Sequence, residues 1–148
     1  MLKERFMMKF AESNFIDRAA TAVAECFRDV PFCTLRWRQR EVPFGTDRID
    51  RVGKLRIQDV GERTLLLEVK TSGQPRIVRE AINALVRYRS SFKNAYGIVV
   101  APFISDAAAE ILAAENIGYV DFAGNCRICL DKLYIKKSGQ SNPCTEKR

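Results

Sequence analysis

Apolar residues recur at steps of three and four along three stretches of the chain, the spacing that gathers them on one face of an α-helix. The predicted helices cover residues 11–29, residues 75–92, and the segment between Ser105 and Gly118. Ser13 or Asn14 is the candidate N-cap of the first helix. Pro75 suits the first position of the second helix, and Ser105 is the candidate N-cap of the third.

Strands are predicted where apolar and polar residues alternate, or where turn residues bound a short apolar run. These segments are residues 34–42, 52–58, 64–70, 96–101, 119–122 and 126–135. Turn residues around Gly61 join the second and third strands in an antiparallel hairpin, whereas the helix after them crosses the sheet and makes the third and fourth strands parallel. The pattern predicts an α/β fold of three layers, a central mixed sheet flanked by helices, in the order αβββαβαβ plus one extra strand.

Composition narrows the chemistry that this fold can carry. The chain has 148 residues, a formal charge of +7 and no histidine. A Ser-His-Asp triad, a Cys-His pair and a histidine metal cage are therefore excluded within this sequence. The excess of Lys and Arg favours a polyanionic partner, because a basic face attracts phosphates and releases their counterions.

The cysteine count and the length of the apolar runs indicate the compartment. Five cysteines are an odd number, and Cys126 and Cys129, without a second pair or a histidine, do not complete a zinc site. No apolar run reaches the roughly 20 residues of a membrane helix. We expect one soluble, cytoplasmic domain over residues 1–137 and a frayed tail at 138–148, with neither a membrane nor a haem or nucleotide cofactor as partner.

The candidate chemistry lies at the end of the third strand. Because side chains alternate along a strand, Glu68 and Lys70 project to one face and Val69 to the other. Carboxylate oxygens, the main-chain carbonyl of Val69 and water form the hard oxygen site that Mg²⁺ or Mn²⁺ prefers. Lys70 would orient or deprotonate the attacking water beside such an ion.

A second carboxylate comes from the strand before it. Antiparallel pairing returns the start of the second strand to Glu68, and Asp50 lies near that point if the turn is centred on residues 59–60. Asp47 and Asp59 are the alternatives, because a different turn register would exchange them. We expect one of the three to complete the metal site, with Asp50 preferred.

An aspartate followed on the next strand by a carboxylate-x-lysine tripeptide resembles the PD-(D/E)XK nuclease superfamily, which has the restriction-endonuclease-like fold. The resemblance covers residues 11–135 and includes the order of the elements. It implies a metal-dependent nuclease that hydrolyses DNA phosphodiester bonds with a metal-activated water. Asp50, Glu68 and Lys70 would be the catalytic residues, and Asp50, Glu68 and Val69 would hold the metal.

The sequence departs from this pattern on the second helix. Many members carry a glutamine and a downstream tyrosine there; Tyr88 is present, but Ala84 stands where the glutamine is expected, and Gln74 is a possible substitute. Asp121, in the distinctive segment 118–125, would contribute to a site or pair with a nearby arginine.

Two sets of arginines are candidate DNA contacts. Alternation places Arg36, Arg38 and Arg40 on one face of the first strand, and steps of three and four residues place another three on one face of the second helix. The expected nucleic-acid-binding residues are Arg36, Arg38, Gln74, Arg76, Arg79 and Arg87. The alternative is that these arginines are ordinary solvated surface residues.

Assembly and activity leave two further expectations. One small domain carries one active site, whereas cutting both strands of a duplex needs two, so we expect a homodimer. The alternative function is a catalytically weak or inactive nuclease-like fold that acts as a nucleic-acid-binding or protein-interaction module.

Overall fold

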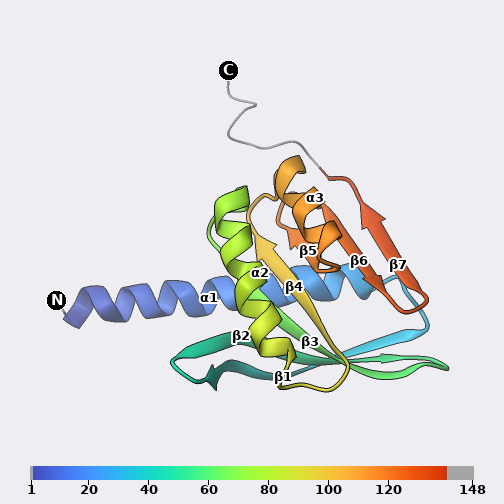
Figure 1. Ribbon diagram of the computed structural model, residues 1–148. Coiled ribbons are helices and arrows are strands. Elements are labelled where there is room, and N and C mark those ends of the chain that lie inside the picture. Colours follow the sequence, from blue (N-terminus) through green and yellow to red (C-terminus); the bar gives the residue numbers. More distant parts are fainter. Residues whose placement is uncertain (1, 140–148) are drawn as a thin grey trace.

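The computed structural model describes the backbone of residues 2–139 and the side chains of residues 14–139. This part of the chain contains three helices and seven strands in the order αβββαβαβββ (Figure 1). They are α1 (Leu2–Phe27), β1 (Cys33–Phe44), β2 (Asp47–Ile57), β3 (Gly61–Val69), α2 (Pro75–Arg89), β4 (Ala95–Ala101), α3 (Asp106–Ala114), β5 (Gly118–Asp121), β6 (Cys126–Leu130) and β7 (Leu133–Lys137).

The seven strands form one sheet in which the order in space equals the order in the chain, β1 to β7. β3, β4 and β5 are parallel, and all other neighbours are antiparallel. The mixed sheet, the hairpin of β2 and β3 and the parallel crossover through α2 are therefore confirmed. α1 covers one face of the sheet, and α2 and α3 cover the other, which gives the expected three layers.

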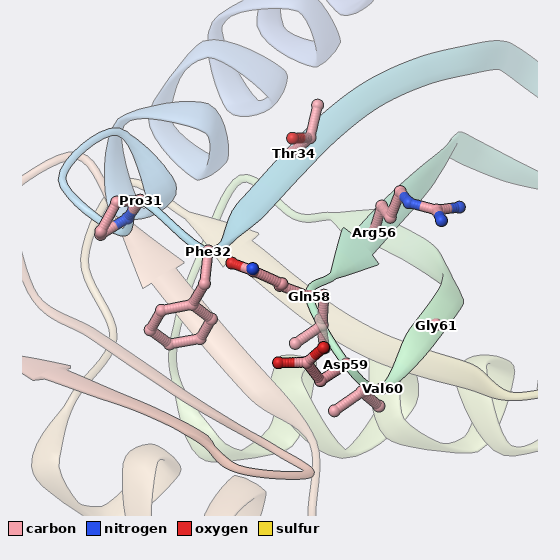
Figure 2. Close-up of a pocket in the computed structure, with 9 residues that line it drawn as sticks. Pro31, Phe32, Thr34, Arg56, Gln58, Asp59, Val60 and Gly61 are labelled. Carbon is pink, nitrogen blue, oxygen red and sulfur yellow. The ribbon is translucent and has the colours of Figure 1, made fainter.

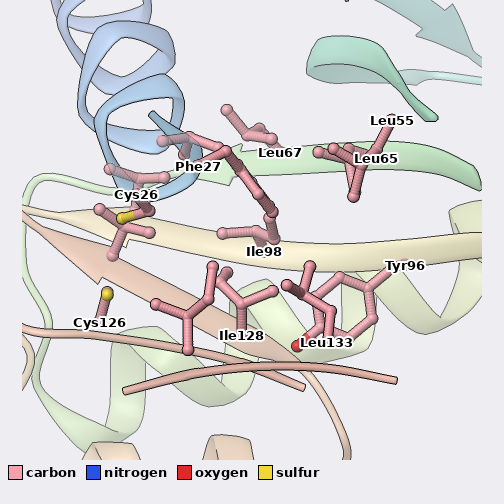
Figure 3. Close-up of a cluster of buried hydrophobic side chains, with 14 of the residues drawn as sticks. Cys26, Phe27, Leu55, Leu65, Leu67, Tyr96, Ile98, Cys126, Ile128 and Leu133 are labelled. Atoms are coloured by element: carbon pink, nitrogen blue, oxygen red, sulfur yellow. The ribbon is translucent and has the colours of Figure 1, made fainter. Parts of the chain in front are cut away.

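The strand β3 shows how alternation divides the core between the two faces. Leu65 and Leu67 pack with α1, in the cluster that Figure 3 shows, whereas Leu66 packs with α2. All three leucines are fully buried. Because side chains two apart in a strand share a face, Glu68 lies on the α2 face of the sheet, two positions beyond Leu66.

Several element boundaries differ from the prediction, most clearly at α1 and at the last predicted strand. α1 begins at Leu2, so neither Ser13 nor Asn14 caps it; the segment before them is rich in Leu, Lys, Glu, Arg and Met, which are strong helix formers. The expected strand 126–135 is two strands, β6 and β7, because the chain turns at Asp131, whose φ of 54° is left-handed. Aspartate tolerates this conformation better than most residues and therefore suits such a turn.

The arginines of β1 also differ from the prediction. The pairing of β1 with β2 shifts between Trp37 and Gln39, so that one extra residue enters β1 and reverses the alternation after it. Arg40 is thereby half-buried and forms an ion pair of 2.9 Å with Asp17 of α1. Arg40 does not share the exposed face of Arg36 and Arg38.

The C-terminal end of the described chain is held to the sheet. The N–H of Gly139 donates to Oδ1 of Asn125 at 2.7 Å. The tail predicted at 138–148 lies outside the described residues from 140 onward. Across the described helices, none combines the length and apolar character needed to cross a membrane.

Candidate metal centre

Asp50 and Glu68 meet where β2 leaves β3. The last paired residues of the two strands are Arg51 and Leu67, and Asp50 and Glu68 are the next residues on either side. At this point a side-chain hydrogen bond takes the place of backbone pairing between the strands: Oδ2 of Asp50 accepts the N–H of Val69 at 2.8 Å. Both acids are buried, with 8% of Asp50 and 6% of Glu68 exposed. Of the three candidate aspartates, Asp50 is the one that faces Glu68.

The two carboxyl groups are held against their electrostatic preference. Burial, the hydrogen bond shared with Asp50 and the charge of Asp50 together raise the pKa of Glu68 to about 8. Asp47 adds to this effect, and the ammonium group of Lys70 opposes it. Near neutral pH Glu68 therefore favours its protonated form, which donates a hydrogen bond to Asp50.

The chain also places a tyrosine hydroxyl beside the pair. The hydroxyl of Tyr88, on α2, donates to the carbonyl of Arg48 at 3.0 Å. Burial and the charges of Glu68 and Asp47 raise the pKa of Tyr88 to about 12. The resemblance pointed to Tyr88 as the tyrosine of the second helix but not to the position of its hydroxyl. One turn earlier, the buried Ala84 leaves only a methyl group at the position where a glutamine was expected.

Two arginines form ion pairs around the carboxylates: Arg87, which was expected only as a DNA contact, and Arg48, which was not predicted as a site residue. Arg87 donates to Asp47 at 2.7 Å, and both side chains are about half exposed. Arg48 lies 3.9 Å from Oδ1 of Asp50 and 3.3 Å from Glu41. The alternation of acidic and basic residues in 47–51 is the sequence signal that could have indicated these pairs. Arg87, a predicted DNA contact, thus lies beside the site in an ion pair with Asp47 and remains about half exposed.

Asp59 lies at the other end of the hairpin. It occupies the turn between β2 and β3 with a φ of 65°. There it lines a cavity of about 450 Å³ together with Pro31 and Phe32 (Figure 2). Since Glu68 lies at the opposite end of β3, this position rules out Asp59 as a partner of Glu68.

The remaining arginines are solvent-exposed. Arg36, Arg38, Arg76 and Arg79 are exposed, and no ion pair joins them to other described side chains. Arg36 lies opposite Lys54, and Lys54 lies opposite Thr64, so Arg36 shares the sheet face of Glu68. Gln74 is exposed at the N-cap of α2, where its side chain makes no capping hydrogen bond.

Asp121 has a structural role and does not pair with Arg127. Its carboxylate accepts the backbone N–H groups of Ile104, Ala123 and Asn125 at 3.0, 3.0 and 2.8 Å, and the side-chain amide of Asn125 at 2.9 Å. These donors fill its acceptor sites, and the residue is only 3% exposed. Asp121 fixes the turn after β5 to the loop before α3.

The donor set at Asp50 and Glu68 fits a hard divalent cation. Among the described residues, no cluster of three or more Cys, His, Asp or Glu side chains could hold a metal. Further ligands would therefore be main-chain carbonyls and water, as is common for Mg²⁺. The N–H and C=O of one strand residue point to the same side, so the carbonyl of Val69 faces β2, as its N–H does. A cation would replace the proton that keeps the two carboxylates together.

Comparison with known proteins gives a likeness to a few solved structures. No family model and no curated protein matches the sequence. The chain is similar to the EndoMS-dsDNA2 complex, with 21% identity and a TM-score of 0.49 over 70% of this chain and 44% of that chain. It is also similar to a repair endonuclease from Pyrococcus abyssi, with 19% identity and a TM-score of 0.49 over 70% and 46% of the two chains. The chain thus spans less than half the length of these structures.

Proposed function

We propose that this chain is a Mg²⁺- or Mn²⁺-dependent nuclease that hydrolyses phosphodiester bonds in DNA. The observation that carries the proposal is the burial of two carboxyl groups in contact, with Lys70 beside them. Two buried carboxyl groups in contact can ionise together only at a cost in free energy, and such arrangements are typical of functional sites. A purely structural carboxylate is satisfied as Asp121 is, by donors.

Each residue of the pair and its neighbours has a separate task in this proposal. Asp50, Glu68 and the carbonyl of Val69 would hold the cation. When bound, the cation would polarise a phosphoryl oxygen and make a bound water more acidic. Lys70 orients the attacking water and offsets the negative charge that develops on the phosphate.

The arginines would position the DNA. Arg36 on β1 and Arg76 and Arg79 on α2 are exposed on the side of the sheet where Glu68 lies. Contacts of this kind bind phosphates without reading sequence. Replacing Arg76 and Arg79 together by alanine should weaken DNA binding and reduce its dependence on salt by about one counterion per arginine.

Cleavage of supercoiled and linear DNA tests the proposal. We expect cleavage with Mg²⁺ or Mn²⁺, none in EDTA, and at least about a 100-fold loss in Glu68→Gln and Lys70→Ala. Glu62→Gln is the matched control, because Glu62 lies on the same strand and is exposed. Equal residual cleavage in all four proteins would indicate a contaminant and remove the assignment.

A second candidate function is DNA binding without cleavage. Two observations favour it: Ala84 stands in place of a glutamine, and the described residues contain no cluster of three or more acidic, Cys or His side chains that could hold a metal. Binding that needs no divalent cation and weakens steeply with salt, together with no cleavage, would select this function.

Cutting both strands of a duplex would require two copies of the site, and we propose a homodimer for that activity. Light scattering with and without DNA measures the mass. A monomer under all conditions would restrict the activity to nicking or to single strands.

A further inference from the structure

Two cysteines from distant parts of the chain meet in the core on the α1 face of the sheet. Cys26 lies in the last turn of α1, and Cys126 is the first residue of β6, one hundred residues later. Their thiols share a hydrogen bond. Figure 3 shows both sulfur atoms at the same end of the cluster. The sulfur of Cys26 also lies 3.5 Å from the carbonyl of Ala22, so its proton has two acceptors within reach.

The pair lines a cavity despite its burial. Cys26 is 6% exposed and Cys126 is 1% exposed, but both border a cavity of about 400 Å³ between α1 and the β5–β6 region. Arg18, Thr21 and Lys137 are among the other residues that line it. This volume admits a small oxidant without unfolding of the core.

The surroundings distinguish the two sulfur atoms. The hydrogen bond from Cys26 and the positive charge and N–H of Lys137 lower the pKa of Cys126 to about 7, against the opposing effects of burial and Asp121. The same hydrogen bond, burial and the charge of Glu25 raise the pKa of Cys26, although Lys137 lowers it. Cys126 is therefore the better nucleophile, and Cys26 remains a thiol.

We propose that Cys26 and Cys126 are a redox-active dithiol that closes to a disulfide between α1 and β6 when the protein meets hydrogen peroxide. The thiolate of Cys126 attacks one peroxide oxygen, and the O–O bond breaks. Hydroxide is the leaving group, and Cys126 becomes a sulfenic acid. The sulfur of Cys26 then attacks that sulfur, the S–O bond breaks, and the oxygen leaves as water with the proton of Cys26. Both thiols are oxidised by one peroxide, which is reduced to water.

The disulfide would add a covalent link between α1 and the sheet, which are otherwise held together by noncovalent packing. α1 is joined to the turn after β5 by the edge-to-face contact of Phe15 with Phe122 and by Arg18, which lies 4.1 Å from the same ring. A crosslink between residues this far apart removes much conformational freedom from the unfolded chain. Oxidation is therefore expected to raise the melting temperature, and reduction to lower it again. The site is separate from Asp50 and Glu68, which lie on the other face of the sheet.

Peptide mapping after peroxide treatment tests the proposal. The protein used carries Cys33→Ser, Cys129→Ser and Cys144→Ser, which leaves only the pair; Cys144 lies outside the described residues. We expect one linked peptide containing both cysteines, a loss of two hydrogen atoms and a higher melting temperature, all reversed by dithiothreitol. The single variants Cys26→Ser and Cys126→Ser should lack the linked peptide.

The proposal is overturned if both thiols of the pair still react with an alkylating agent after peroxide has oxidised Cys33 or Cys129 in the wild-type protein. It is equally overturned by a sulfinic acid on Cys126 without a link, or by a link between two chains only. If a single variant does not fold, mapping of the wild-type protein decides, since the position of the link identifies the pair.

Discussion

The proton on Glu68 provides a test of the carboxyl pair that needs no substrate. In the unfolded chain this group has its ordinary pKa of 4.5, and in the folded protein the pKa is about 8. Between these values the folded state binds one more proton than the unfolded state. The free energy of unfolding therefore falls as the pH rises from about 4.5 to about 8, the window between the two pKa values.

The size of the effect follows from the two pKa values. Each pH unit inside the window lowers the free energy of unfolding by about 1.4 kcal/mol, so the loss from about pH 4.5 to about pH 7 is of the order of 3 kcal/mol. Glu68→Gln keeps the shape of the protonated acid and has no charge to lose. We therefore expect the variant to match the wild type near pH 4.5 and to be more stable by about 3 kcal/mol near pH 7.

Urea unfolding in EDTA, from about pH 5 to about pH 8, measures this difference. The exposed Glu62→Gln serves as the matched control and should follow the wild type across the range. A difference in free energy of unfolding between Glu68→Gln and wild type that does not grow with pH would contradict the raised pKa of Glu68. In that case Glu68 would ionise in the folded protein as easily as in the unfolded chain. Its carboxyl group would then not be in contact with that of Asp50.

Three further outcomes are expected. Asp121→Ala leaves one buried and two partly buried N–H groups without their acceptor and should lower the free energy of unfolding by about 3 kcal/mol in urea. Gly73→Ala would place its Cβ 1.9 Å from the carbonyl oxygen of Phe103, so we expect a loss of about 2 kcal/mol or more and a shift of the loop after Lys70, measurable by urea unfolding and hydrogen exchange. Mg²⁺ should raise the melting temperature of the wild type but not that of Glu68→Gln, and an equal rise in both would contradict a site at this residue.

Local patterns were sufficient for most of the fold. Ser105 caps α3 as expected, since its side chain accepts the N–H of Ala108 at 3.2 Å, and Pro75 is the first residue of α2. The bulge after Trp37 was not predictable from alternation, because Arg38, Gln39 and Arg40 are all polar and give no sign of which one is inserted. The turn at Asp131 was missed because apolar residues continue on both sides of it.

The candidate site was likewise predictable from the sequence only in part. Alternation was enough to place Glu68 on the α2 face, and the hairpin register brought Asp50 to it, whereas Lys70 lies just beyond the end of β3. The pairs of Asp47 with Arg87 and of Tyr88 with Arg48 each join residues forty apart. No local period reports such contacts, because they depend on where α2 lies on the sheet.

The agreement between chain order and spatial order in the sheet bears on how the molecule is assembled. Each strand from β2 onward adds to the edge formed by the strand before it, so no strand has to insert between two that are already paired. Pairings between neighbours in the chain close short loops, and such topologies fold faster than those that depend on distant partners. During synthesis, the hairpin of β2 and β3 can form before β4 leaves the ribosome, and it offers a finished template to each later strand. β6 and β7 are added last, and Cys126 of β6 then packs against α1, the first helix to be synthesised.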